Sequence, residues 1–197
     1  MMRRAGHNPR LQRTSSPCHA GLALLAAATA LGGCAPLDVE PARDVLDTNT
    51  GTTVVRLAQP MELVAAVPRA RTADPFAYLA TFATNRMGAR RLFLWLAAPG
   101  DEAIVATPQL LCDGQAIALQ RLSIEPASLG LSQPPYPRPA PWSVEYYYPL
   151  DDRTLAILVG ARTMTVVVAY AQSGATRFEG RIDTAALQAF ADQAGVR

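Results

Sequence analysis

The sequence contains no lysine, and its two histidines, His7 and His19, both lie in the first 20 of its 197 residues. Without lysine, the chain cannot form a Schiff base with a carbonyl substrate. From residue 34 onward it also lacks histidine. That part of the chain therefore cannot use a serine–histidine or cysteine–histidine nucleophile, and it cannot build a histidine-based zinc site.

Long hydrophobic runs are scarce as well, and the longest extends from Gly21 to Leu31, about eleven residues. A helix that crosses a bilayer needs roughly 20 apolar residues, so this run is too short. Residues 1–20 carry four arginines and no acidic residue. A basic start, a short apolar core and small residues at its end are the layout of a secretory signal peptide, which we expect at residues 1–33.

The end of this run, Leu31-Gly32-Gly33-Cys34, resembles the lipobox of bacterial lipoproteins. The resemblance implies cleavage between Gly33 and Cys34 and attachment of diacylglycerol to the Cys34 thiol. Two or more acyl chains anchor a protein stably, because each buried CH₂ contributes about 0.8 kcal/mol. An ordinary secretory signal with a chance cysteine is the alternative. The resemblance covers residues 1–34, and no family is recognised for residues 35–197.

Ala35, which follows the lipobox cysteine, bears on the membrane that the protein would occupy. By the same resemblance, alanine at this position favours the periplasmic face of the outer membrane over the inner membrane. The chain's formal charge of +2 includes the four arginines of residues 1–20. From Cys34 onward, 14 arginines stand against 16 acidic residues, a net charge of −2, so nothing indicates a nucleic-acid partner.

Cysteine is also too rare for a disulfide framework. If Cys34 carries lipid and Cys18 is removed with the signal peptide, Cys112 has no partner for an internal disulfide. Cys112 has no cationic neighbour in the sequence that would activate it. We therefore expect Cys112 to be a small buried residue and not a reactive thiol.

Chemistry that needs only carboxylates is not excluded. Its candidates are two adjacent pairs, Asp101-Glu102 and Asp151-Asp152. Neighbouring side chains usually point apart, and both pairs stand where turns or helix starts favour aspartate. We therefore expect structural roles for these acids, and we predict no catalytic residue, no metal site and no cofactor.

The chain after Cys34 divides into two parts. Residues 34–51 are predicted to be the lipidated cysteine and a flexible tether, because residues 35–51 hold two prolines and four acids without apolar periodicity. Residues 52–197 are enough for a single domain with one core. Within it, strands are predicted at 76–84 and 90–97, joined as a hairpin, and a second hairpin turns at Asp113-Gly114.

The C-terminal third has the clearest pattern. Residues 142–150 alternate as a strand, and Asp151 and Asp183 each stand at the start of a helical stripe that ends in glycine. The chain therefore predicts a mainly β (α+β) fold. We expect an antiparallel β-sandwich or strongly bent sheet of about eight strands, with two short helices in the C-terminal half. An eight-stranded barrel is the alternative.

Residues 126–141 contain six prolines and predict a long surface loop. A rigid structural crossover is the ordinary interpretation, and a partner-binding loop is the alternative. In the strand 142–150, alternation places Tyr146 and Tyr148 in the core and leaves Tyr147 outside. Tyr136 and Tyr147, together with Trp95, are therefore the candidates for an exposed partner-binding surface.

Two functions fit these observations. The first is a non-catalytic accessory, scaffold or binding subunit of the cell envelope. Its partners would be the membrane, through the lipid anchor, and an envelope protein. The second is a carboxylate-dependent hydrolase of cell-wall glycan, which would need two carboxylates about 5–10 Å apart in a cleft.

Overall fold

The computed structural model describes residues 40–67, 74–120 and 126–196. These residues belong to one compact unit, Val39–Arg197. The predicted signal peptide, with Gly33 and Cys34, lies outside the described residues, and so does the first part of the predicted tether.

Ten strands form one antiparallel sheet in the described part of the chain. They are β1 (Ala42–Asp47), β2 (Thr52–Leu57), β3 (Met61–Ala65), β4 (Phe76–Arg86), β5 (Ala89–Ala98), β6 (Gln109–Cys112), β7 (Gln115–Ile117), β8 (Val144–Leu150), β9 (Thr163–Tyr170) and β10 (Gly174–Arg181). The predicted bent antiparallel sheet with two late helices is confirmed, with two strands more than expected. The sheet does not close on itself, so the alternative of an eight-stranded barrel is wrong.

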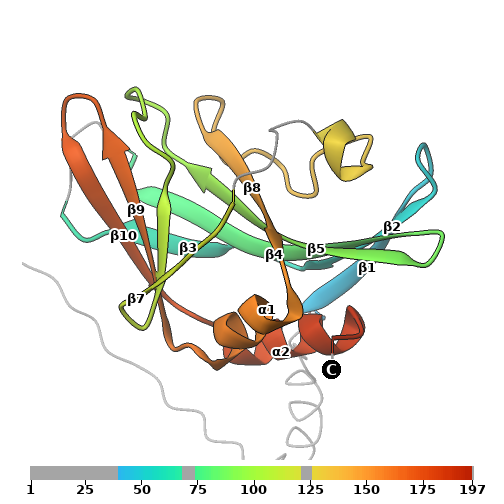
Figure 1. Cartoon of the computed structure of the whole chain (residues 1–197). Coiled ribbons are helices and arrows are strands. Elements are labelled where there is room, and N and C mark those ends of the chain that lie inside the picture. The colour runs from blue at the N-terminus through green and yellow to red at the C-terminus, as the bar shows by residue number, and fades with distance from the viewer. Residues whose placement is uncertain (1–39, 68–73, 121–125, 197) are drawn as a thin grey trace, which may run out of the picture. The chain divides into compact units, whose positions relative to one another are not determined.

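The sheet bends around β4, which has different neighbours along its length (Figure 1). Residues 53–56 of β2 and residues 61–64 of β3 pair with successive parts of β4. Pro60 separates these two strands, because proline has no N–H to continue a ladder. The sheet continues from β3 through β10, β9, β6 and β7, whereas β5 and then β8 extend it on the other edge of β4.

Two tight turns join the predicted hairpins, and the turn at Asp113-Gly114 has the predicted chemistry. In the β6–β7 turn, Asp113 and Gly114 have φ of +47° and +80°, and in the β4–β5 turn Met87 and Gly88 have φ of +52° and +84°. Positive φ at both central residues is the mark of a type I′ turn, whose twist matches that of the flanking strands. The predicted hairpins are therefore confirmed.

One face of the sheet, here called the helix face, is covered by α1 (Asp152–Gly160) and α2 (Thr184–Gln193) (Figure 1). Both predicted N-caps are confirmed: Asp151 accepts from the Thr154 N–H at 2.7 Å, and Asp183 accepts from the Ala186 N–H at 3.0 Å. Helix α2 packs on β1, β2 and β4. No helix of the described residues is long and apolar enough to span a membrane.

The opposite face, here called the proline face, is covered by residues 126–141, here called the proline segment. It begins with the 3₁₀ helix η1 (Pro126–Leu129) and buries Leu129, Leu131 and Tyr136. Strands β5 and β8 are therefore covered on both faces. Tyr146 and Tyr148 stack on each other with ring centroids 6.4 Å apart, while Tyr147 lies edge-on to Phe82 on the other face.

The predicted boundary between tether and domain is wrong. Residues 42–47 form β1, which pairs with β2 along its whole length, from Ala42 opposite Leu57 to Asp47 opposite Thr52. Ala42 is buried in the core, whereas the rest of β1 is largely exposed. The strand is held by its backbone ladder, by the burial of Ala42 and by hydrogen bonds of Asp44 and Asp47 to Gln193 and Ser132, so the folded domain begins before residue 52.

Candidate partner-binding groove

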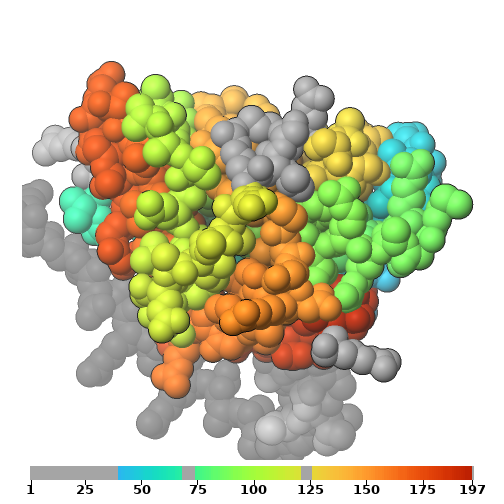
Figure 2. Space-filling view, in the orientation of Figure 1, coloured from blue at the N-terminus to red at the C-terminus, as the bar shows by residue number. Residues whose placement is uncertain are grey.

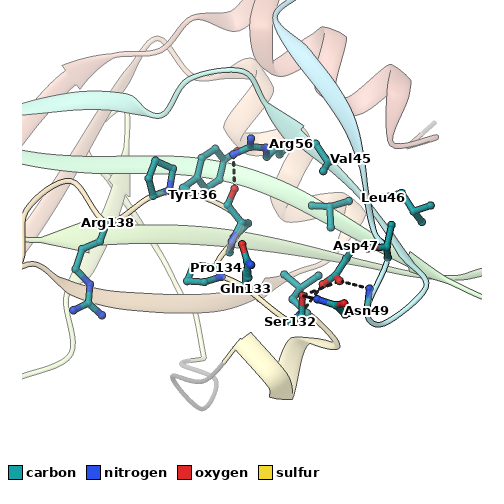
Figure 3. A pocket seen from close by; sticks show the side chains of 15 residues that line it. Val45, Leu46, Asp47, Asn49, Arg56, Ser132, Gln133, Pro134, Tyr136 and Arg138 are labelled. Atoms are coloured by element: carbon teal, nitrogen blue, oxygen red, sulfur yellow. Dashed lines mark hydrogen bonds between the residues drawn. The ribbon is translucent and has the colours of Figure 1, made fainter.

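A groove of about 530 Å³ lies between the β1–β2 hairpin and residues 131–138 of the proline segment (Figure 3). Its volume is within the range of small-ligand and peptide sites, about 300–1,000 Å³. In the space-filling view, the yellow start of the proline segment stands against the blue tip of the β1–β2 hairpin (Figure 2). The groove lies between two segments that are about 80 residues apart in the sequence, so no local sequence motif predicts it.

Tyr136 holds the proline segment on the sheet. Its side chain is 1% exposed, and its ring packs on Trp95 with centroids 5.0 Å apart. The hydroxyl donates to the Thr81 carbonyl oxygen of β4 at 2.8 Å. Burial raises the pKa of the Tyr136 hydroxyl far above its ordinary value, so the group remains a neutral donor.

Arg56 forms the side of the groove next to Tyr136 (Figure 3). Its Nη1 donates to the Pro135 carbonyl oxygen, and its guanidinium carbon lies 5.3 Å from the centre of the Tyr136 ring. Arg43 on β1 stands directly opposite Arg56 in the antiparallel register. Among the residues that the structure describes, no carboxylate comes within ion-pair distance of either arginine.

Asp47, at the end of β1, is an acidic residue that is already saturated with hydrogen bonds. Its carboxylate accepts from the Ser132 N–H at 2.6 Å, from the Ser132 hydroxyl at 2.8 Å, and from the Asn49 and Thr50 N–H groups. These bonds lower the pKa of the Asp47 carboxyl, with the Ser132 N–H the largest cause. Asp47 therefore ties the hairpin to the proline segment and leaves the positive charge of Arg56 unneutralised.

A second polar cluster lies under the end of the proline segment. Glu145 of β8 is 7% exposed and accepts from Trp95 Nε1 at 3.1 Å and from Arg138 Nη2 at 3.4 Å. Burial, with a further contribution from the charge of Glu145, raises the pKa of Tyr147 to about 12. A buried carboxylate needs such partners, so Arg138 compensates Glu145 while its own side chain remains half exposed.

The prediction that Tyr136 and Tyr147 form an exposed surface is wrong. They are 1% and 0% exposed, and Trp95 is 0% exposed, because the proline segment covers the face on which they lie. The exposed apolar side chain that faces the groove is instead Val45 (43%) of β1, and Leu46 (59%) is exposed on the other face of the same strand, in a segment predicted to be a tether. The sequence did hold one signal for burial on both faces, the unbroken apolar run of β5.

The candidate acids Glu102, Asp151 and Asp152 make structural contacts, as predicted. Glu102 accepts from the N–H groups of Gln172 and Ser173 and thereby holds the β9–β10 turn. Asp151 caps α1, and Asp152 pairs with Arg90 at 3.0 Å. The described ranges contain no group of three or more histidine, cysteine or acidic side chains that could hold a metal ion.

Cys112 is buried, as expected, with its Sγ 3.4 Å from the sulfur of Met164. Burial, followed by the charge of Asp113, raises the pKa of the Cys112 thiol to about 11. The thiol is therefore protonated at neutral pH and has the character of a small apolar core residue.

No protein-family model, curated protein sequence or solved structure matches the chain. The function therefore has to be argued from this chain's own residues. In the described part, the groove, the exposed side chains of β1 and the two arginines that no described carboxylate neutralises lie next to one another.

Proposed function

We propose that this protein is a lipid-anchored, non-catalytic binding subunit of the bacterial cell envelope, attached through Cys34 at the periplasmic face of the outer membrane. The lipobox-like sequence Leu31–Cys34 supports the anchor, and Ala35 supports the outer membrane over the inner membrane. The observation that carries the binding role is the groove of about 530 Å³ between β1 and the proline segment.

The early start of the fold limits how far the domain can stand from its anchor. Eight residue steps separate Cys34 from Ala42, the first residue of β1. At about 3.3–3.6 Å per residue, even a fully extended chain would place Ala42 no more than about 29 Å from Cys34. The groove lies toward the other end of β1, at Val45–Asn49, and so away from Ala42, where the strand begins.

The alternative, a carboxylate-dependent hydrolase, has less support. Such an enzyme needs two carboxylates that face each other across a cleft. Glu102 is bonded to the β9–β10 turn, whereas Asp151 and Asp152 lie at the start of α1 and are bonded there. The acid that lines the groove, Asp47, is bonded to Ser132.

The anchor is tested by replacing the cysteine that would carry it. We expect Cys34→Ser to abolish incorporation of labelled palmitate and to leave an unprocessed precursor in the cell. Cys18→Ser is the matched control, because it removes a thiol before the apolar run and should leave palmitate labelling unchanged. Palmitate labelling of the Cys34→Ser chain equal to that of the wild type would refute the lipid anchor.

Membrane location needs a separate measurement. We expect the wild-type protein to sediment with outer-membrane markers in a density gradient of disrupted cells. The substitution Ala35→Asp should shift it toward the inner-membrane fraction, if the residue after the lipidated cysteine acts here as the resemblance implies. A wild-type chain found wholly in the inner-membrane fraction would refute the outer-membrane location without affecting the anchor.

A further inference from the structure

We infer that the groove binds an extended acidic segment of a protein partner, which lies alongside β1 and places a carboxylate between Arg43 and Arg56. This inference rests on the proposed binding function and deepens it, since it states the chemistry of the partner. It is carried by three observations: an edge strand with exposed apolar side chains, an opposed pair of arginines, and an acidic groove residue that is already bonded.

The first observation is that β1 is an edge strand. It pairs with β2 along one side, and no other strand of the described residues pairs with its outer side. An unpaired edge presents backbone N–H and C=O groups that can accept another strand. Val45 and Leu46, on opposite faces of β1, are exposed where an added strand would cover them.

The second observation is the arginine pair. Directly opposed residues of an antiparallel ladder have Cβ atoms about 4.5–5.5 Å apart, and like charges at that distance destabilise the pair. Arg43 and Arg56 occupy such positions, on the same face of the sheet as the groove. A carboxylate placed between them would offset this repulsion and accept charge-assisted hydrogen bonds from both guanidinium groups.

The third observation is that none of the carboxylates in the described ranges forms an ion pair with these two arginines. Asp47, which lines the same groove, spends its oxygens on Ser132 and on the backbone of its own turn. Arg138, at the other end of the groove, does not add to this charge, because it is paired with the buried Glu145. Arg43 and Arg56 therefore leave positive charge beside the groove, and this charge complements a negatively charged ligand.

The apolar and backbone features select an extended peptide over a lipid headgroup. A headgroup phosphate would satisfy the arginines, but it would leave the edge of β1 unpaired and Val45 and Leu46 uncovered. An extended segment that alternates apolar and acidic side chains satisfies all three features, because successive side chains of a strand point to opposite faces.

The test uses the full-length protein in detergent micelles and three fluorescein-labelled hexapeptides. The probe is Thr-Val-Glu-Val-Thr-Val, the charge control replaces its glutamate by glutamine, and the backbone control carries N-methyl groups at alternate residues. Fluorescence anisotropy measures Kd for each. A hydrogen-bonded charged pair is worth about 1.5–3 kcal/mol, so we expect the glutamine peptide to bind at least roughly tenfold more weakly. The N-methylated peptide should also lose affinity.

Protein variants locate the site. Arg43→Gln and Arg56→Gln should each weaken binding of the glutamate peptide and leave the glutamine peptide unaffected. Among the described residues Arg43, unlike Arg56, forms no hydrogen bond with the proline segment, so its variant keeps the test valid even if Arg56→Gln loosens that segment. Arg153→Gln is the matched control, because Arg153 is exposed on α1, which covers the helix face of the sheet and not the groove.

Three outcomes would overturn the inference. The first is equal affinity for the glutamate and glutamine peptides, and the second is full affinity in both the Arg43 and Arg56 variants. The third is a chain that binds no peptide and instead binds anionic phospholipid vesicles or dimerises through β1. None of these outcomes bears on palmitate labelling. If the chain incorporates palmitate at Cys34 but does not bind the glutamate peptide, only the inference is refuted. If the chain binds the glutamate peptide but incorporates no palmitate, only the lipid anchor is refuted.

Discussion

Tyr136 offers the sharpest test of whether the proline segment is part of the core. Two substitutions separate its contacts. Tyr136→Phe removes only the hydroxyl that donates to the Thr81 carbonyl oxygen at 2.8 Å. Tyr136→Ala also removes the ring, which packs on Trp95 with centroids 5.0 Å apart and lies under the guanidinium of Arg56.

The expected losses follow from burial. A hydrogen bond lost in a site that is 1% exposed leaves the Thr81 carbonyl without that donor, which costs about 1–2 kcal/mol. Truncating a buried aromatic ring to alanine costs about 3–5 kcal/mol, and the contacts with Trp95 and Arg56 place Tyr136→Ala in the upper part of that range. For a domain of this size, each kcal/mol lowers Tm by about 2–4 °C.

The assay is thermal and denaturant unfolding of the purified chain, followed by circular dichroism and by tryptophan fluorescence, to which Trp95 contributes. We expect Tm to fall by about 2–8 °C for Tyr136→Phe and by at least about 6 °C for Tyr136→Ala. Tyr78→Phe is the control, because Tyr78 is only partly buried and its hydroxyl makes no hydrogen bond to the described residues. If Tyr136→Ala unfolds at the same temperature as this control, the proline segment is not a structural layer.

The parts of the fold that could be predicted from the sequence are those with local chemical causes. Asp113-Gly114 predicted a type I′ turn because both residues accept positive φ more readily than most. Asp151 and Asp183 predicted helix starts because a short carboxylate side chain can accept from a backbone N–H three residues later. Each signal is contained within a few residues, so no knowledge of the rest of the molecule was needed.

Strand β1 could not be predicted, because its formation depends on a distant part of the chain and not on local residues. A half-buried strand is recognised by alternating apolar residues, but β1 buries only Ala42 and exposes Val45 and Leu46. Its charged residues, Arg43 and Asp44 among them, are typical of edge strands and equally typical of a solvated tether. Only the pairing with β2, a tertiary fact, distinguishes the two.

The groove was even harder to predict from a sequence pattern than β1 was. The apolar run of β5 and the consecutive tyrosines of β8 indicate strands that are buried on both faces, and Leu131 and Tyr136 give the proline segment apolar residues to bury. These signals together predict that something covers the second face. They do not predict that the cover leaves a gap beside β1, because the gap depends on the register of segments about 80 residues apart.

Two further predictions concern the opposite end of the sheet. A Cβ at Gly180 of β10 would stand 2.5 Å from Leu63 Cδ2 and 2.8 Å from the Glu62 carbonyl oxygen. Gly180→Ala should therefore lower the free energy of unfolding, measured by denaturant titration, by about 1–3 kcal/mol. Gly160→Ala is the control and should not lower it, because a Cβ at Gly160 would meet nothing within 4 Å. The second prediction is that the buried Cys112 thiol, whose pKa is raised from 9.0 to about 11, stays unmodified by iodoacetamide at pH 8 until the chain unfolds, as mass spectrometry would measure. As the pH rises, the unfolded chain releases the thiol proton before the folded chain does, so the free energy of unfolding should fall between about pH 9 and pH 11. This fall should be smaller in Cys112→Ala, which has no thiol to titrate. An identical pH dependence in the two chains would show that the thiol is not desolvated in the folded state.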